Sequence, residues 1–360
     1  MSTVFDYIKW RGDLTFPTVK LGEVDAIMFA MISYINYGKL CHGEIRTMKD
    51  AAASYCADGK YDKVSLGLIM PSKNINRCFC EAARAKRYRD TLISDFEDRT
   101  DYAKGYQFGA ITYHIDGGRM VVVFRGTDDS IVGWREDCRL AFLDEIPAQR
   151  MAVEYLEAVA AKYPSEKIYV TGHSKGGNLS LYAAVKCSDA VKDRIVRVYA
   201  FDGPGFSSSF FASEEYGKIK DKISVILPQS STVGTMFEKG DKFTVIKSTN
   251  SGLLQHDPYS WELDGPRFIK YKELSRAGKN NEEQFRRRMR KMTTEEKREV
   301  VETLFDVIDA TGAKTLTEFS RGGLKKFNTI IKTYGGLNKE KREMISEIVL
   351  RMLEIKKVGK

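Results

Sequence analysis

The chain has 360 residues, 42% of them hydrophobic, and no apolar run near the roughly 18 residues that a membrane span needs. The N-terminus, MSTVFDYIKWRGD, lacks the apolar segment of a secretory signal. These features argue against a membrane-spanning or exported protein, and we expect a cytoplasmic chain with one large core and an accessory unit.

The net charge of +9 is concentrated at the C-terminal end. Residues 267–360 carry 24 Lys and Arg against 14 Asp and Glu, which leaves a net of −1 for residues 1–266. The densest cationic run, FRRRMRKM at Phe285–Met292, could touch anionic lipid headgroups or nucleic acid. Because acidic residues resume at Glu295 without an aromatic stacking pattern, a solvated helix face is the simpler interpretation. We predict at most weak contact with an anionic membrane surface and no specific nucleic acid partner.

The six cysteines show no regular framework. They are Cys41, Cys56, Cys78, Cys80, Cys138 and Cys187. A chain of this size can fold without disulfide bonds, so we expect reduced thiols, as in a cytoplasm. Cys78 and Cys80 lack the second ligand pair of a structural zinc site, and we expect neither a metal nor an organic cofactor.

In chain order, the first predicted elements are helices. Residues 23–37 and 75–96 have helical patterns and are expected to cover a sheet. From residue 106 the chain alternates strand-like and helix-like segments at the spacing of an α/β sheet. Strands are predicted at 106–115, 119–126, 167–173, 194–203, 222–229 and 242–248.

Three local signals complete this prediction. Residues 148–163 have the apolar spacing of an amphipathic helix. The pair Gly117-Gly118 indicates a hairpin turn, so the sheet should begin antiparallel and become parallel. A capping-box pattern from Thr293 to Glu296 opens a helical C-terminal region. The fold class is therefore α/β, with a mostly parallel central sheet flanked by helices.

One stretch, IYVTGHSKGGNLSLYAA at Ile168–Ala184, places a lone serine between a strand and a helix. A serine hydroxyl is a weak nucleophile unless it is exposed beside a base and near donors for the developing oxyanion. The sequence from Gly172 to Gly176 fits the G-x-S-x-G nucleophile elbow in the required strand-turn-helix context. Ser174 is therefore the predicted nucleophile.

The base follows by elimination among four histidines. In an α/β-hydrolase the chain order is serine, acid, histidine, and only His256 follows Ser174. His173 should point away from the serine hydroxyl and pack the elbow, and His42 and His114 are expected to be surface or satisfied polar residues.

At the level of motifs, VVVFRGTDDSIVGWREDC followed by VTGHSKGGNLSLYAA resembles the paired signatures of the class 3 (fungal triglyceride-type) lipases. A bacterial branch of lipase-like α/β-hydrolases is more similar still, since it shares DYIKWRGDLTF, FDGPGF and HDPYSW. The resemblance covers roughly residues 5–265. It implies an α/β-hydrolase fold and hydrolysis of acyl esters, and it names no substrate.

The resemblance also implies roles for three residues. Thr127 would supply an oxyanion donor through its backbone N–H and hydroxyl, and the N–H of Lys175 would supply the second. Asp137 matches a lipase carboxylate that supports the oxyanion residue, although an ordinary acid at a helix start would have the same pattern.

The sequence departs from these lipases at the acid. The loop after the strand ISVILP contains no carboxylate, and Ser231 stands about where the aspartate should be. Other α/β-hydrolases place the acid one strand earlier, where Asp202 follows a predicted strand and could orient the histidine. The alternatives are Asp241, Asp257, or a histidine oriented by Ser231 with no acid.

The sequence thus predicts a serine hydrolase that cleaves a small-molecule or lipid ester through an acyl-enzyme. The alternative is a non-catalytic binding or regulatory protein that kept the fold, with its basic C-terminal helices contacting anionic lipid or nucleic acid. We expect an α/β-hydrolase domain at 1–266, made of a helical cover (1–100) and a sheet core (101–266), followed by a basic helical region at 267–360.

Overall fold

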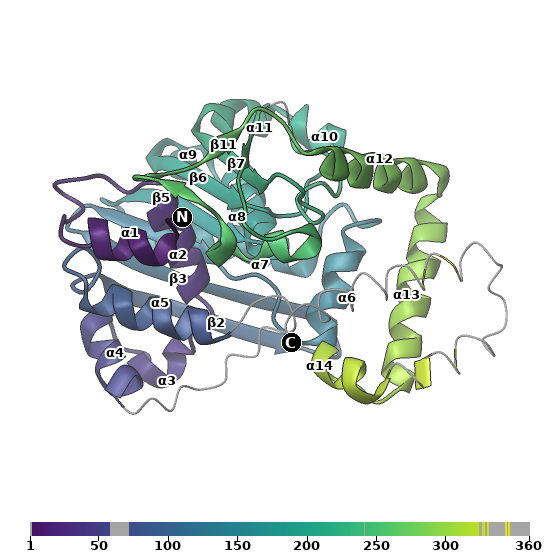
Figure 1. Ribbon diagram of the computed structural model, residues 1–360, viewed down its shortest axis with the longest axis horizontal. Coiled ribbons are helices and arrows are strands. Elements are labelled where there is room, and N and C mark those ends of the chain that lie inside the picture. The colour runs from purple at the N-terminus through teal and green to yellow at the C-terminus, as the bar shows by residue number, and fades with distance from the viewer. Residues whose placement is uncertain are drawn as a thin grey trace.

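A nine-stranded mixed sheet runs through the molecule (Figure 1). The computed structural model describes residues 2–57, 72–240 and 242–323, together with residues 326, 327, 330, 343 and 345. The strand order is β1-β2-β3-β4-β5-β6-β7-β8-β11, and a separate two-stranded sheet pairs β9 with β10. The strands are β1 (Arg46–Thr47), β2 (Leu92–Asp101), β3 (Tyr106–Asp116), β4 (Arg119–Phe124), β5 (Lys167–His173), β6 (Ile195–Phe201), β7 (Ile223–Pro228), β8 (Phe243–Ile246), β9 (Leu263–Asp264), β10 (Arg267–Phe268) and β11 (Lys270–Tyr271).

The strand pairing changes from antiparallel to parallel and back to antiparallel across the sheet. Strands β1 to β4 pair antiparallel, β4 to β8 pair parallel, and β11 closes the far edge antiparallel to β8. The hairpin predicted at Gly117-Gly118 joins β3 to β4, as expected. Because parallel strands end at the same edge, the turns after β4, β5, β6 and β7 meet at one side of the sheet.

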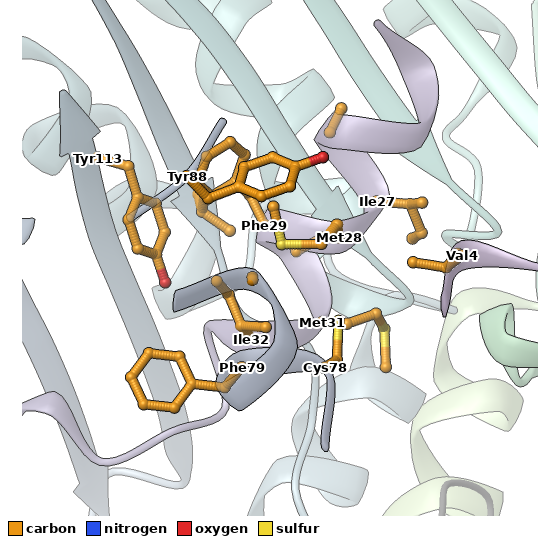
Figure 2. Packing of buried hydrophobic residues seen from close by; sticks show 14 of the residues in the cluster. Val4, Ile27, Met28, Phe29, Met31, Ile32, Cys78, Phe79, Tyr88 and Tyr113 are labelled. Atoms are coloured by element: carbon orange, nitrogen blue, oxygen red, sulfur yellow. The ribbon is translucent and has the colours of Figure 1, made fainter. Parts of the chain in front are cut away.

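N-terminal helices cover one face of the sheet. They are α1 (Val4–Arg11), α2 (Glu23–Ile32), α3 (Tyr37–Cys41), α4 (Met48–Ala57) and α5 (Ser72–Arg84). Every residue of α2 from Val24 to Ile32 is buried, and the one charged side chain among them, Asp25, forms an ion pair with Arg87. Figure 2 shows α2 side chains, among them Phe29 and Ile32, close to Phe79 and Tyr113 from α5 and β3.

The helices that connect the parallel strands cover the opposite face. They are α6 (Ile131–Arg139), α7 (Pro147–Lys162), α8 (Lys175–Lys186), α9 (Asp189–Arg194), α10 (Ser208–Phe211) and α11 (Glu214–Ile219). Alternate strand residues face the two layers: Val121 and Val123 belong to the core under α2, and Met120 and Val122 to the core under α7 and α8. The result is a three-layer α/β/α arrangement.

The C-terminal part adds α12 (Arg276–Lys291), α13 (Thr294–Ala310) and α14 (Leu316–Glu318). The predicted capping box is formed, since the Thr293 hydroxyl accepts from the Glu296 N–H and the Glu296 carboxylate accepts from the Thr293 N–H. A third apolar cluster joins α13 to α6 and includes Ile131, Leu304 and Phe305. In Figure 1, α12 and α13 lie on the same side of the molecule as α6.

The six predicted strands are confirmed as β3 to β8, but the predicted helix at 75–96 is wrong in its second half. Helix α5 ends at Arg84, and β2 begins at Leu92. The sequence of β2, LISDFEDRTD, is rich in carboxylates and contains a bulge between Ser94 and Glu97, where Asp95 has a φ of 52°. The bulge breaks the strict alternation that identifies a strand from sequence.

The expectation of reduced cysteines is also wrong for one pair. Cys56 and Cys80 form a disulfide that joins α4 to α5, while Cys41, Cys78, Cys138 and Cys187 are free. No spacing rule links cysteines 24 residues apart, so only the packing of the two helices brings them together. The disulfide also removes one argument for a cytoplasmic location, because such bonds persist mainly in oxidising compartments.

Within the described parts of the chain, no helix has the length and apolar character needed to cross a membrane.

Candidate active site

Ser174 lies at the turn between β5 and α8. Its backbone has φ 58° and ψ −131°, a conformation that is strained for a residue with a side chain. The turn is held by its neighbours: the Ser174 N–H donates to the Phe201 carbonyl at the end of β6, and the Ser174 carbonyl accepts from Gly177. This is the geometry of a nucleophile elbow, in which the serine side chain projects beyond the sheet.

Two glycines make this tight turn possible. A Cβ atom at Gly172 would collide with the backbone of Gly176 and lie 2.6 Å from the Phe124 carbonyl oxygen. A Cβ atom at Gly176 would lie 2.9 Å from the Phe124 carbonyl carbon. The absence of both side chains therefore lets the start of α8 pack directly on β4 and β5.

The carboxylate of Asp202 and the imidazole of His256 form a direct pair. Asp202 follows β6 with a positive φ of 44°, and its Oδ2 lies 2.6 Å from His256 Nδ1. Since a carboxylate can only accept, Nδ1 carries the proton and Nε2 is left as the basic nitrogen. Both side chains are buried, at 1% and 4% exposure, so the pair is shielded from competing water.

Ser231, after β7, contacts the same carboxylate from the other side. Its hydroxyl donates to Asp202 Oδ1, and the Gly234 N–H donates to that oxygen at 3.2 Å. The position where the lipase resemblance predicts an acid thus holds a hydroxyl that supports the acid of the preceding strand. The structure brings Ser231, Asp202 and His256 into one chain of hydrogen bonds.

The other two candidate acids do not contribute to this chain. The Asp257 carboxylate accepts from the Tyr259 N–H at 3.1 Å and caps a short 3₁₀ turn. Burial raises the pKa of Asp257 to about 6. Asp241 lies outside the described residues.

His173, next to the serine, packs against the pair rather than joining it. Its ring centroid lies 4.4 Å from that of His256 and 5.9 Å from that of Trp261. Burial lowers the pKa of His173, and the adjacent His256 ring lowers it further, so His173 is a neutral packing group. Ser174 and His256 both lie within the described part of the chain, and they form no hydrogen bond with each other in this structure. Catalytic hydrogen bonds in unliganded enzymes are often long and tighten only with substrate.

The remaining histidines lie away from this site. His42 is exposed at the end of α3. His114 on β3 is within hydrogen-bonding distance of Ser94 and Glu166.

Thr127 and Asp137 form a hydrogen-bonded pair near the serine. Thr127 follows β4, and its hydroxyl donates to Asp137 Oδ2 at 2.6 Å. A Cβ atom at Gly126 would lie 3.3 Å from Ser174 Cβ, so the loop that carries Thr127 runs directly beside Ser174. Burial raises the pKa of Asp137 to about 6, against the lowering effect of the Lys175 charge and the Thr127 hydrogen bond.

Lys175 contributes more than its backbone. As the first residue of α8, its N–H has no acceptor within the helix and is available at the positive end of the helix dipole. Its side chain is 1% exposed: Nζ forms an ion pair with Glu136 and donates to the Gln107 carbonyl at 2.7 Å. Glu136 also accepts from the Ala148 N–H. The sequence did not indicate this buried pair, which ties α8 to α6.

Part of the same site has the residue types of a metal-binding group. Across the described ranges, the one group of three potential ligands consists of His173, Asp202 and His256, whose ligand atoms lie within 4.8 Å of one another. Because Asp202 and His256 are already hydrogen-bonded to each other, we assign no metal to the site.

The order of these parts along the chain identifies the class of protein. The serine follows β5, the aspartate follows β6 and the histidine follows the last parallel strand, which is the order of an α/β-hydrolase. The fold is that of a lipase-like α/β-hydrolase, as the motif resemblance predicted. The chain belongs to the Mbeg1-like family, whose model matches residues 82–306. That it comes from a bacterium stays a prediction.

Solved structures of lipases are similar to this chain at low identity. The M37 lipase has 16% identity and a TM-score of 0.37, over 61% of this chain and 70% of its own. A mutant form of MDLA from Penicillium cyclopium has 14% identity and a TM-score of 0.39, over 71% and 87%. Lipase II from Rhizopus niveus has 15% identity and a TM-score of 0.36, over 62% and 82%. No curated protein matches the sequence.

Proposed function

We propose that the protein is a serine hydrolase that cleaves carboxylic esters, with lipid esters as the expected substrate class. Ser174 is the nucleophile, His256 the general base and acid, and Asp202 the residue that orients His256. The backbone N–H groups of Thr127 and Lys175 donate to the oxyanion, and Asp137 supports Thr127. No residue of this scheme needs a cofactor.

In the first half of the reaction, the Ser174 oxygen attacks the ester carbonyl as its proton passes to His256 Nε2. The carbonyl oxygen takes the negative charge and accepts from the two backbone donors. When the intermediate collapses, the bond to the alcohol oxygen breaks and His256 returns the proton to the leaving group. The acyl group then remains on Ser174.

In the second half, His256 takes a proton from water, and the resulting hydroxide attacks the acyl-enzyme. The bond between the acyl carbon and the Ser174 oxygen breaks, and the serine regains its proton from His256. Asp202 keeps the Nδ1 proton in place throughout and stabilises the imidazolium that forms twice per cycle.

The observation that carries this proposal is the buried hydrogen bond of 2.6 Å between His256 and Asp202 beside a serine held in a strained elbow. A hydrogen-bonded acid and histidine could serve packing alone. Strain at the adjacent serine has no structural benefit of its own, because a glycine at residue 174 would adopt the same φ without strain.

The test is labelling with a fluorophosphonate probe combined with hydrolysis of p-nitrophenyl esters of graded acyl length. We expect the wild type to be labelled and active, and Ser174→Ala to be unlabelled with hydrolysis reduced by several powers of ten. A folded wild type that neither reacts with the probe nor cleaves any ester of the series contradicts the proposal.

One observation favours a second candidate, a binding protein that kept the fold without the chemistry. It is the missing hydrogen bond between Ser174 and His256. Such a protein would bind an acyl compound without turnover. The probe distinguishes the two, since an inactive serine would not be phosphonylated.

Helix α12 supports a further part of the proposal, weak contact with an anionic lipid surface. Arg287, Arg290 and Lys291 are exposed at its C-terminal half. Sedimentation with anionic vesicles should decrease when all three are replaced by Gln and when salt is raised. Unchanged sedimentation would leave α12 as a solvated surface helix.

A further inference from the structure

Tyr34 places its hydroxyl beside the candidate oxyanion site. The residue follows α2, and its side chain is buried, with 5% exposure. A Cβ atom added at Gly126 would collide with the Tyr34 hydroxyl oxygen and lie 3.3 Å from Ser174 Cβ. The Tyr34 hydroxyl and the Ser174 side chain therefore both border the same small space above Gly126, and Gly126 directly precedes Thr127.

Within the described structure, this hydroxyl has no hydrogen-bond partner. Buried polar groups are nearly always paired, because leaving one unpaired costs about 1–3 kcal/mol. The Gly126 N–H lies close enough to act on the phenol oxygen, but an N–H can only donate, so the phenolic proton has no acceptor within the described structure. The hydroxyl thus lacks an acceptor at the place where an oxyanion is expected to form.

We propose that Tyr34 is a further catalytic residue, whose hydroxyl donates a hydrogen bond to the oxyanion of the tetrahedral intermediate. This inference rests on the proposed function. The substrate carbonyl oxygen would then accept the hydrogen bond from Tyr34. This hydrogen bond would be strongest in the tetrahedral intermediate, in which that oxygen carries a full negative charge.

The surroundings of Tyr34 favour a donor over a proton carrier. Burial raises the pKa of the phenol, and the nearby carboxylates of Asp128 and Asp137 raise it further, against the lowering effect of Arg125. The hydroxyl therefore keeps its proton throughout the pH range of ester hydrolysis. A neutral O–H that is already oriented can stabilise developing charge without giving up the proton.

The alternative is that Tyr34 only fills space, and the two roles predict opposite results for Tyr34→Phe. Phenylalanine occupies the same volume, so packing is kept. Removing an unpaired buried hydroxyl should leave the melting temperature unchanged or raise it. Loss of an oxyanion donor should lower kcat by about 100-fold with little change in KM.

The experiment measures kcat and KM for p-nitrophenyl butyrate, the rate of fluorophosphonate labelling, and the melting temperature of Tyr34→Phe. The matched control is Tyr113→Phe, because the Tyr113 hydroxyl is also buried but donates to Tyr37 at 3.0 Å. The control should lose melting temperature and keep kcat, whereas Tyr34→Phe should keep melting temperature and lose both kcat and labelling rate.

Each other outcome overturns the inference. A Tyr34→Phe variant with wild-type kcat shows that the hydroxyl does not act on the oxyanion, and a variant that unfolds shows that it has a structural partner. If the wild type is active and Ser174→Ala is not, such results remove Tyr34 alone. If the folded wild type is neither active nor labelled, the proposed function fails and this inference fails with it.

Discussion

Ser231 donates a hydrogen bond to Asp202 across the ends of two neighbouring parallel strands, β7 and β6. The carboxylate oxygen that accepts it is Oδ1, and the other oxygen, Oδ2, faces His256. With the Gly234 N–H also donating to Oδ1, the plane of the carboxylate is fixed before any substrate binds. Ser231, at the strand end that lacks an acid, therefore still influences His256 because it holds Asp202 in place.

This arrangement makes Asp202→Asn the most informative substitution at the acid. Asparagine keeps the shape but can donate to Nδ1, which favours the imidazole tautomer with the proton on the wrong nitrogen. We expect kcat to fall by about 10⁴-fold, the order seen for the equivalent change in a serine protease triad. Steady-state hydrolysis of p-nitrophenyl butyrate measures the effect.

The matched control is Asp257→Asn, next to the histidine in sequence. Its carboxylate accepts only from the Tyr259 N–H among the described hydrogen bonds, and an amide oxygen can replace it there. We expect kcat to stay within about tenfold of the wild type, since the altered hydrogen bond does not involve His256. Equal losses in both variants would argue against Asp202 as the orienting residue.

Ser231→Ala should lower the stability of the protein measurably, and it should lower kcat much less than Asp202→Asn does. The substitution removes one donor to a buried carboxylate, and a hydrogen bond to a charged group contributes about 1.5–3 kcal/mol. The Gly234 N–H and His256 still hold Asp202, so kcat should fall far less than in Asp202→Asn. Urea denaturation and kcat measured on the same preparation compare the two. A crippled kcat with unchanged stability would make Ser231 itself the orienting group.

Much of this site could be predicted from sequence because its parts are local. The glycines around Ser174 and the apolar runs before it act over a few residues, and chain order alone selects His256. The contact between Asp202 and Ser231, which are 29 residues apart, depends on the register of β6 and β7, and no local pattern encodes that register. The sequence could suggest Asp202 or Ser231 as the orienting residue, but it could not indicate that Ser231 supports Asp202.

The features that could not be predicted depend on tertiary packing. The strand β2 is polar because it lies toward the edge of the sheet. Its bulge at Asp95 is held by Lys162, the last residue of α7, and by Tyr163, which follows it. The hydroxyl of Tyr34 reaches the loop before Thr127 only because α2 packs across β5. Likewise, the sequence alone gives no sign that the Lys175 side chain is buried, because its ion-pair partner Glu136 comes from a different helix.

The disulfide between Cys56 and Cys80 gives a prediction about stability. Closing a loop of this length should stabilise the folded state by roughly 3 kcal/mol through the entropy of the unfolded chain. The double variant Cys56→Ser and Cys80→Ser should therefore unfold at lower urea concentration. Its midpoint should not change with added dithiothreitol, whereas that of the wild type should fall. A wild type insensitive to the reductant would indicate that the bond is absent in solution.

Helix α13 should stabilise the sheet-containing part of the molecule through α6. Leu304 is fully buried in the cluster that includes Ile131, and Arg139 on α6 pairs with Glu302 on α13. Leu304→Ala should destabilise the protein by about 2–5 kcal/mol, as expected for a large-to-small change in a core. Glu295→Gln, at an exposed side chain of the same helix, should change stability by no more than about 0.5 kcal/mol. Urea denaturation followed by circular dichroism measures both, and equal values would show that α13 is loosely attached.

Asp137 should make the stability of the protein depend on pH in an unusual direction. Burial raises its pKa in the folded state to about 6, whereas in the unfolded chain it is near the ordinary value of about 4. The folded state then binds the proton more tightly, so this group favours folding fully below about pH 4. That contribution is lost as the pH rises through about 6.

Asp137→Asn removes this titration while keeping an oxygen that can accept from Thr127. The variant should therefore gain stability over the wild type as the pH rises from 4 to 7, by on the order of 2 kcal/mol. Urea midpoints at pH 4, 5, 6 and 7 measure the difference. Asp221→Asn, the same substitution at a side chain that is 81% exposed, controls for the loss of one charge. If the difference between Asp137→Asn and the wild type is constant over this range, or grows toward acid, then Asp137 does not titrate with a raised pKa. The carboxylate beside Thr127 would in that case be ionised at every pH tested.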